Sequence, residues 1–471
     1  MKEQLGYRYL FKNIGLLTLS SFATKFLSFF LVPLYTSVLT TEEYGIYDLL
    51  NVTIAVLVPV LTLNIQEAVI RFSIDNKKSS EAIVNISVKY LTISNALVVV
   101  GLLLNKFLGG SPTIAKYAIY FFLMFLVQSL SGVLICYIRG IDKIIDLSIS
   151  SVITSGVTIV CNILFLVVFK WGLEGYFLAN IVGPSVQCIY LLFRSRFISF
   201  FKCKRYEIEE QEMIAYSKPL IANSVAWWIN NVFDRYVIIL FRGVAENGIY
   251  SVAGKIPSIL NIFQSIFNQA WMLSAVKDFD SDDSTGFFSN TYKAYNCIMV
   301  LICSMIIVCN KILAEILYAK DFFQAWKYVP WLTIAILFGA LSGYVGGFFS
   351  AVKESKIFAV STTIGAIINI VFNFVFTPKY GAMGAAVSTT ISYFFVWAYR
   401  FYQSKKYIRL RVSVERDLVT YMLLGVQSVF SITITGNKMY LYVVGVFLII
   451  CILYLEDIKI VISKVMRRKT A

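Results

Sequence analysis

Three long apolar segments of this chain carry polar side chains at steps of three and four residues, a spacing that stacks them on one face of a helix. Such a face inside an apolar segment can line a water-filled cleft and hold a polar or charged ligand there. The alternative for the hydroxyls and carboxamides alone is that they join neighbouring helices. The residues are Ser21, Lys25 and Ser28 in the first segment, Asn223, Trp227, Asn230 and Asp234 in the second, and Lys255, Ser258 and Asn261 in the third.

The charges decide between these interpretations. Lys25 is near the middle of its apolar segment, where an uncompensated charge costs roughly 3 kcal/mol. We therefore expect Lys25 to face a cleft, with a structural ion pair as the alternative. Lys255 and Lys89 are closer to the ends of their segments, so both side chains could instead reach the membrane surface along their aliphatic stems.

Asp234 and Arg235 are consecutive, so on a helix they point about 100° apart and do not readily pair. Asp234 follows the stripe that contains Asn223 and Trp227. Arg235 would point toward a neighbouring helix or sideways into the cleft. The alternative is that both charges are solvated near the outer membrane surface.

The elements that must position these residues are membrane-spanning helices. The 471 residues are 58% hydrophobic and only 15% charged, which excludes an ordinary soluble domain and indicates an all-α polytopic membrane protein. With no histidine and no metal-type cysteine spacing, we expect no metal site and no cofactor. About fourteen spans are predicted, at 12–38, 44–68, 82–105, 114–138, 147–169, 175–194, 217–241, 248–275, 291–318, 328–351, 357–377, 381–400, 418–435 and 439–456.

Charge placement predicts the orientation of these spans. Most lysines and arginines outside the spans fall in the N-terminal segment and in alternate loops, which places both termini in the cytoplasm. The net charge of +15 is then explained by loops that face anionic lipid headgroups, and no nucleic-acid partner is needed. Thr40 and Glu43 have the spacing of a capping box, which predicts a helix start there.

Two phrases recur along the chain and indicate an internal duplication. Gly-Ile-Tyr follows a glutamate at 45–47 and again at 248–250, 203 residues later. The stretches 160–175 and 371–384 share Val-x-Asn-x-x-Phe, a lysine, an aromatic residue and Gly-x-x-Gly. The alternative is chance similarity among apolar helices.

The offset contains six spans, an even number, so the two copies enter the membrane from the same side. The expected architecture is two parallel-repeat six-helix lobes around a central cleft, with two further helices at the C-terminus. The predicted domains are 1–200 for helices 1–6, 201–405 for helices 7–12 with a basic cytoplasmic linker, and 406–471 for helices 13–14 and the tail.

This architecture resembles the multidrug/oligosaccharidyl-lipid/polysaccharide (MOP) exporter superfamily. The stretches "LVPLYTSVLTTEEYGIYDLL", "QEAVIRF", "WWINNVFDRYVI" and "NGIYSVAGKIPSIL" are similar to its polysaccharide branch, the Wzx-type O-antigen flippases. The resemblance covers essentially the whole chain. It implies a bacterial inner-membrane flippase in O-antigen and lipopolysaccharide biosynthesis, not an enzyme, that moves undecaprenyl-diphosphate-linked oligosaccharides outward by alternating access. A polysaccharide polymerase and a chain-length regulator are the further partners it implies.

Under this hypothesis Lys25, Lys255 and Arg235 meet the phosphates, while asparagines, serines and aromatic rings meet the sugar. Arg71 is a headgroup anchor or the first contact for an arriving phosphate, and Lys89 has a similar position on the cytoplasmic side. The candidate carboxylates for proton or sodium coupling are Asp48, Glu67 and Asp234. The alternatives are a multidrug exporter of the same superfamily and a membrane-embedded glycosyltransferase or polysaccharide polymerase.

Overall fold

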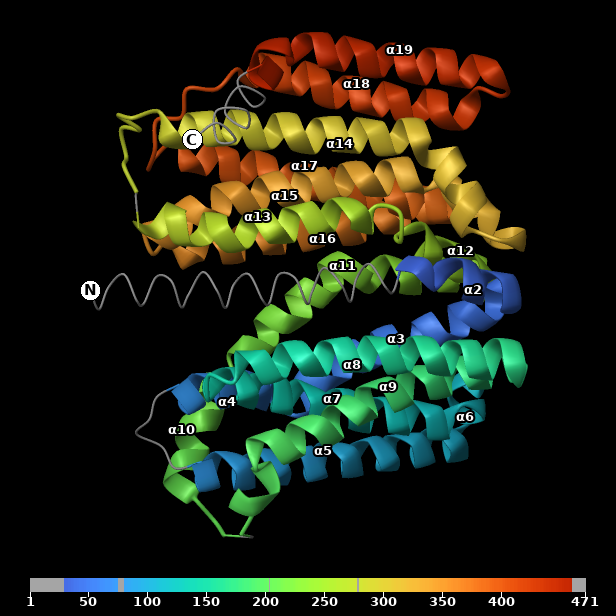
Figure 1. Cartoon of the computed structure of the whole chain (residues 1–471), viewed down its shortest axis with the longest axis vertical. Coiled ribbons are helices and arrows are strands. Elements are labelled where there is room, and N and C mark those ends of the chain that lie inside the picture. The colour runs from blue at the N-terminus through green and yellow to red at the C-terminus, as the bar shows by residue number, and fades with distance from the viewer. Residues whose placement is uncertain (1–28, 75–79, 203, 278, 460–471) are drawn as a thin grey trace. The chain divides into compact units, whose positions relative to one another are not determined.

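The computed structural model describes residues 29–74, 80–202, 204–277 and 279–459. These residues form helices, turns and loops, and no strand occurs among them. The chain divides into two compact units, residues 1–232 and 233–471 (Figure 1). The boundary falls inside one helix, α11.

Among the described residues, unit 1 contains a set of helices of which most run side by side (Figure 1). They are α2 (Val32–Val38), α3 (Thr41–Leu61), α4 (Ile65–Ile74), α5 (Ser80–Leu108), α6 (Pro112–Lys116), α7 (Ala118–Gly140), α8 (Ile144–Asn162), a π-helical segment (Ile163–Val168), α9 (Gly172–Ser195), a 3₁₀ turn (Phe197–Phe200), α10 (Glu207–Ser217) and the first part of α11 (Leu220–Arg242). The predicted capping box is confirmed, because the Thr40 side chain accepts from the backbone N–H of Glu43 and the Glu43 carboxylate accepts from that of Thr40.

Unit 2 continues α11 and holds the remaining helices. They are α12 (Val244–Ala253), α13 (Ser258–Lys277), α14 (Phe287–Leu317), a 3₁₀ helix (Lys320–Lys327), α15 (Val329–Ala351), α16 (Ser355–Tyr380), α17 (Ala382–Ser404), α18 (Val414–Thr433) and α19 (Asn437–Leu453). Across both units, eight of the described helices are long and apolar enough to cross a membrane: α3, α5, α7, α8 with its π-helical end, α9, α14, α15 and α16. The prediction of an all-α polytopic membrane protein is confirmed.

Two predicted spans are each divided into two helices. The span 44–68 becomes α3 and α4, because Pro59 lies near the end of α3 and Leu63 and Asn64 then adopt left-handed backbone angles. The span 248–275 becomes α12 and α13, separated by a turn that ends at Pro257. Proline lacks an N–H and disfavours helical geometry in the residue before it, so a helix tends to stop there.

The duplicated phrases make equivalent contacts in the two units. A methyl group on Gly175 would lie 3.1 Å from the carbonyl oxygen of Phe165, and one on Gly384 would lie 2.5 Å from that of Phe376. In both copies a glycine therefore lets the second helix of a hairpin approach the backbone of the first. The preceding asparagines, Asn162 and Asn373, are both buried and both donate to the carbonyl four residues earlier. The shared glycine contact is what the predicted duplication leads us to expect, and the duplication itself stays a prediction.

In unit 2, two oppositely charged side chains join the corner between α11 and α12 to the corner between α16 and α17. The Glu246 carboxylate accepts from the backbone N–H of Ala382, 2.6 Å away, at the start of α17. The Arg242 guanidinium donates to the carbonyl oxygens of Pro378 and Lys379, each 3.0 Å away, at the end of α16. A carboxylate at a helix N-terminus and a cation at a helix C-terminus both complement the helix dipole.

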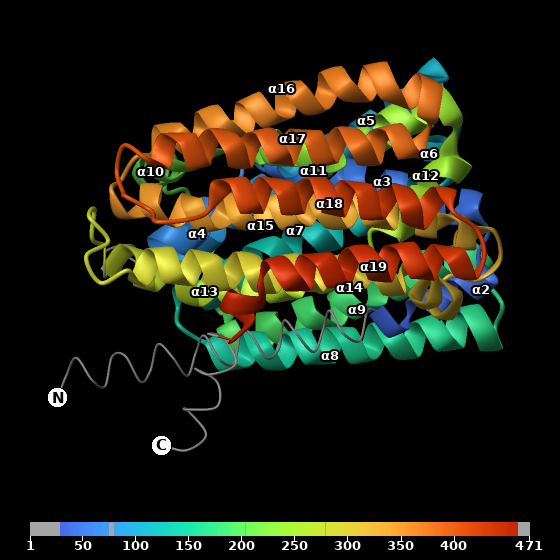
Figure 2. The ribbon, with the colours of Figure 1, turned by 90° about the horizontal axis from the view of Figure 1, so that it is seen from above.

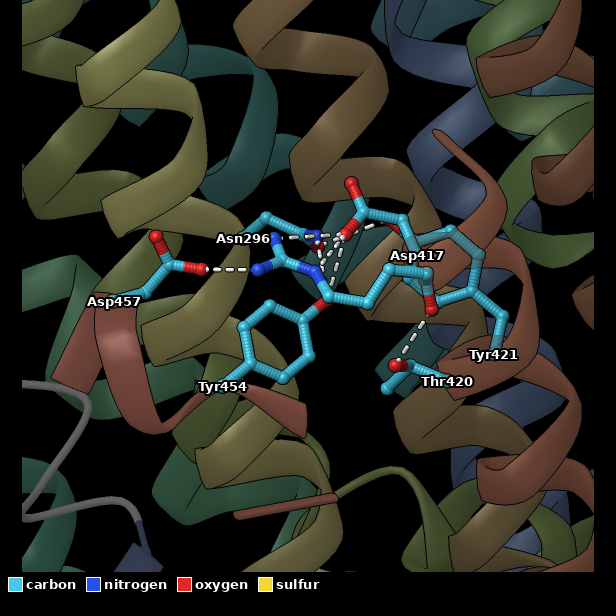
Figure 3. Close-up of polar contacts among 7 residues, drawn as sticks. Asn296, Asp417, Thr420, Tyr421, Tyr454 and Asp457 are labelled. Atoms are coloured by element: carbon cyan, nitrogen blue, oxygen red, sulfur yellow. Dashed lines mark hydrogen bonds and ion pairs between the residues drawn. The ribbon is translucent and has the colours of Figure 1, made fainter. Parts of the chain in front are cut away.

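The C-terminal helices are fastened to the rest of unit 2 by a buried polar cluster (Figure 3). Arg416 pairs with Asp457 at 2.6 Å and with Asp417 at 3.3 Å, and its guanidinium lies 4.3 Å from the Tyr454 ring centroid. Tyr454 donates to Asp417, and Asn296 of α14 donates to the Tyr454 hydroxyl. Figures 1 and 2 show α18 and α19 running side by side; α19 packs against α14, and α18 packs against α14 and α15. The last two helices are thus an integral part of unit 2.

Gly381 is the residue on which the α16–α17 corner depends. It has φ +60° and ψ −143°, a region that only glycine adopts readily, and a methyl group there would lie 2.2 Å from a Glu246 carboxylate oxygen.

We expect Gly381→Ala to destabilise the protein by about 1–3 kcal/mol, measured as a lower melting temperature in detergent. The matched control is Gly445→Ala in α19, where nothing lies within 4 Å and alanine should be neutral or slightly stabilising. Equal melting temperatures for the two variants would contradict this account.

Candidate functional site

Unit 1 contains a pocket of about 420 Å³, and the described residues that line it carry no charge. Its volume lies in the range of small-molecule sites. The lining residues are Ala55, Val58 and Pro59 of α3, Gln66 of α4, Gln128 of α7, and Asn223, Ser224 and Trp227 of α11. Asn223 and Trp227, which the sequence analysis named as site residues, therefore line the same pocket. Gln66 and Gln128 also line it but were not predicted.

Hydrogen bonds orient two of the carboxamides and the serine hydroxyl that line the pocket. Gln128 donates to Asn51, 3.0 Å away, and Asn64 donates to the Ser224 hydroxyl, 3.2 Å away. Gln66 makes a longer contact of 3.4 Å to Asn64. Side chains held in this way present donors and acceptors at set positions, which suits a ligand rich in hydroxyl groups.

A glycine makes room for one of them. A methyl group on Gly132 of α7 would lie 2.5 Å from the side-chain oxygen of Gln66. Small residues let transmembrane helices approach closely, and here the small residue also leaves space for a carboxamide. The close packing of α4 against α7 thus contributes directly to the shape of the pocket.

Of three tryptophans that could meet a sugar ring, the structure distinguishes one. Trp271 is 3% exposed and donates its indole N–H to the carbonyl oxygen of Tyr344. Trp228 donates its indole N–H to the carbonyl oxygen of Val52, 2.8 Å away. Trp227 is 51% exposed and lines the pocket. It is therefore the residue of the three with a free aromatic face, and such faces stack on flat ligand surfaces.

Asp234 belongs to a second polar cluster, which lies in unit 2. Its carboxylate is 5% exposed and accepts from the hydroxyls of Tyr250 and Thr389. Asn369 donates to Thr389, and its own side-chain oxygen accepts from Asn373. Asp234 is thus buried, so the alternative of a solvated charge is wrong for this residue.

The remaining members of the predicted stripes are dispersed. Asn230 is buried in α11, Ser258 donates to the carbonyl oxygen of Lys255, and Asn261 is exposed on α13. Lys255 lies in the turn between α12 and α13 and not inside a helix, because the helix ends before Pro257. The Arg235 side chain is partly buried.

The other candidate charges lie in unit 1. Lys89 pairs with Glu210 of α10 at 2.6 Å. Arg71 is exposed in the last turn of α4, Glu67 is exposed in its first turn, and Asp48 is buried in α3. Ser21, Lys25 and Ser28 lie outside the described residues, so their placement remains a prediction. In the described part of the chain, no group of three or more cysteine, aspartate or glutamate side chains could hold a metal ion.

Comparisons with known proteins support the predicted family. A family model described as "Polysaccharide biosynthesis protein" matches residues 10–272. An uncharacterised membrane protein of Methanocaldococcus jannaschii, MJ1068, is 21% identical over 172 residues, which are 33% of this chain and 34% of that protein. The matched stretch thus spans about a third of that relative.

Two solved structures have the same fold. The lipid II flippase MurJ in an inward closed conformation matches with a TM-score of 0.73 and 15% identity, over 93% of this chain and 99% of that one. An inward-facing MATE multidrug transporter of the MOP superfamily matches with a TM-score of 0.63 and 13% identity, over 81% and 94%. The predicted resemblance to a polysaccharide biosynthesis family is confirmed by the family model. Because the family model covers more than half of the chain, the protein belongs to the polysaccharide biosynthesis protein family.

Proposed function

We propose that this protein is a flippase that moves undecaprenyl-diphosphate-linked oligosaccharide units from the cytoplasmic to the outer leaflet of a bacterial inner membrane by alternating access. The observation that carries the proposal is the uncharged pocket of unit 1, with its carboxamides and one exposed indole, in a chain of the polysaccharide biosynthesis family. Both termini are cytoplasmic in this proposal. A polysaccharide polymerase and a chain-length regulator are its partners.

The physical problem of flipping is a charged and hydrated headgroup that cannot enter hydrocarbon. In our proposal the headgroup is divided between two kinds of contact. Lys25, Lys255 and Arg235 accompany the diphosphate, and the pocket that contains Trp227 and Asn223 accepts a sugar. The lipid tail stays in the bilayer throughout.

The composition of the pocket favours this ligand over the alternatives. A multidrug exporter for cationic drugs would need carboxylates, and the described residues that line the pocket include none. Carboxamides offer both donors and acceptors, which match sugar hydroxyls. Drug efflux measured in cells that express the protein, and glycan chain extension measured in vitro, separate the exporter and the glycosyltransferase or polymerase from the flippase.

Removal of the pocket's polar or aromatic groups should slow transport. We expect Asn223→Ala to lower translocation about 2- to 10-fold, since a net hydrogen bond contributes about 1 kcal/mol. Trp227→Ala should lower it more, and Trp227→Phe should retain part of the activity because a ring remains. The measurement is complementation of a strain that lacks its own flippase, with accumulated lipid-linked intermediates identified by mass spectrometry.

The matched control is Asn437→Ala, which removes an exposed carboxamide at the start of α19 in unit 2. It should complement like the wild type. If Asn223→Ala and Trp227→Ala reach the membrane in normal amounts and also complement fully, the pocket has no part in transport.

The second prediction concerns Lys25. A fixed cation that meets phosphate in a watery cleft should be replaceable by arginine but not by alanine. We expect Lys25→Ala to abolish most translocation, Lys25→Arg to keep much of it, and the control Lys438→Ala, at an exposed position, to be neutral. Wild-type rates from a normally inserted Lys25→Ala protein would overturn this role.

The third prediction concerns the driving force. An inside-negative membrane potential favours the outward movement of an anion by about 2.3 kcal/mol per charge per 100 mV. The potential alone could therefore drive transport. Proton or sodium coupling through Asp234, Asp48 or Glu67 is the alternative. Asp234 is the strongest of these candidates, because it is buried beside the hydroxyls of Tyr250 and Thr389.

We expect Asp234→Asn to remove any dependence of translocation on pH or sodium in proteoliposomes, while transport driven by the potential remains. Exposed Glu67 provides the comparison, and Glu67→Gln should keep the wild-type ion dependence. An unchanged ion dependence in Asp234→Asn would exclude Asp234 as the coupling group. Translocation that continues with all gradients collapsed would exclude secondary-active drive.

A further inference from the structure

The segment that connects the two repeats, residues 196–219, is fastened to one face of α5. Glu81, Asn85 and Lys89 of that helix are spaced four residues apart, so their side chains project from the same face. Each of the three contacts the connecting segment or α10 within it. All of these contacts lie within unit 1.

Glu81 makes the first contact. Its carboxylate pairs with the Lys202 ammonium and accepts from the Tyr206 hydroxyl at 3.2 Å. The hydrogen bond to Glu81 raises the pKa of Lys202 above its ordinary value. The carboxylate thus holds two side chains of the connecting segment, one on each side of Cys203.

Asn85 makes the second contact, and it binds main chain. Its amide donates to the carbonyl oxygen of Phe200 at 3.1 Å, and its side-chain oxygen accepts from the backbone N–H of Lys202 at 3.2 Å. A carboxamide that binds both a donor and an acceptor of an extended backbone fixes the register of that segment. This contact does not depend on any charge.

Lys89 makes the third contact. Its ammonium lies 2.6 and 2.8 Å from the two carboxylate oxygens of Glu210, and the neighbouring Tyr90 hydroxyl donates to the same carboxylate at 2.9 Å. Partial burial tends to raise the pKa of Glu210, but the hydrogen bonds from Lys89 and Tyr90 bring it below its ordinary value. Glu210 is therefore an anion at neutral pH.

Apolar contacts complete the docking of α10. Met213 is buried, and the Tyr216 ring meets the Phe72 ring of α4 edge-on, with the centroids 6.1 Å apart. Only Lys218 and Pro219 separate the end of α10 from the start of α11.

We propose that Glu81, Asn85 and Lys89 form a docking stripe that fixes the inter-repeat segment and α10 to the first repeat, so that this segment moves with unit 1 and does not act as a free tether. A simple tether between two moving halves would need none of these contacts. An exposed ion pair alone contributes little, but three contacts in register on one helix act together with the apolar face of α10. The role of the stripe in transport rests on the proposed function. The stripe residues are positioning residues, because they act through α10 and do not touch the substrate.

The test exchanges the charges of one pair in the full-length protein. Glu210→Lys places two cations side by side and should increase amide hydrogen exchange in 204–217 about 2- to 10-fold. The double variant Lys89→Glu with Glu210→Lys restores an attractive pair and should return exchange to the wild-type level. The matched control is Gln211→Lys, which places a lysine at an exposed position of the same helix beyond its first turn and should leave exchange unchanged. High salt should loosen the wild-type segment in the same direction.

Complementation by the same four proteins tests the positioning role. We expect loss with Glu210→Lys, rescue with the double variant, and no effect with Gln211→Lys. If exchange does not respond to Glu210→Lys, the docking stripe is wrong; if exchange rises while complementation stays normal, the positioning role is wrong. Hydrogen exchange needs no substrate, so this measurement decides the docking even if the proposed flippase function fails.

Discussion

The requirement that polar side chains inside apolar helices find hydrogen-bonding partners organises both units. Hydrocarbon offers no such partners, so each buried polar group must be satisfied within the protein. Arg400 illustrates the requirement, because its buried guanidinium donates to Ser361 and Thr362 and to the carbonyl oxygen of Ser342, and stands over the Phe358 ring. The polar cluster that joins α14, α18 and α19 meets the same need (Figure 3). Against this background, an exposed indole and a set of carboxamides around one pocket stand out as available for a ligand.

Part of the candidate site could be predicted from the sequence, because it follows helical spacing. Asn223 and Trp227 are four residues apart on one helix and do line one pocket. Gln66 and Gln128 are single carboxamides on separate helices, so no spacing connects them. Their meeting depends on how closely α4 packs against α7 at Gly132, and that is a property of tertiary packing.

The fold was predicted in its class, but not in every helix. Pro59 and Pro257 could have predicted that these two spans are broken. The prediction relied instead on the length of the apolar stretches. Helix α10 was not predicted, although Glu207, Glu209 and Glu210 are acidic residues in its first turn. Acidic residues are common at the start of a helix. Because the surrounding segment is basic, these glutamates were interpreted as part of the basic cytoplasmic linker. A further stripe on α16 consists of Asn369, Asn373 and Thr377, which are regularly spaced. Only the structure shows that this stripe is connected through Thr389 to Asp234.

The π-helical segment Ile163–Val168 bears on how the two copies have diverged. Phe165 and Gly175 are ten residues apart, whereas their counterparts Phe376 and Gly384 are eight apart, yet both pairs touch in the same way. Two extra residues in a regular α-helix would rotate everything after them by about 200°. A widened turn accommodates such an insertion locally, and Val167 and Val168 within it are exposed. The ancestral unit could therefore change length inside a transmembrane helix without losing the corner that closes the hairpin.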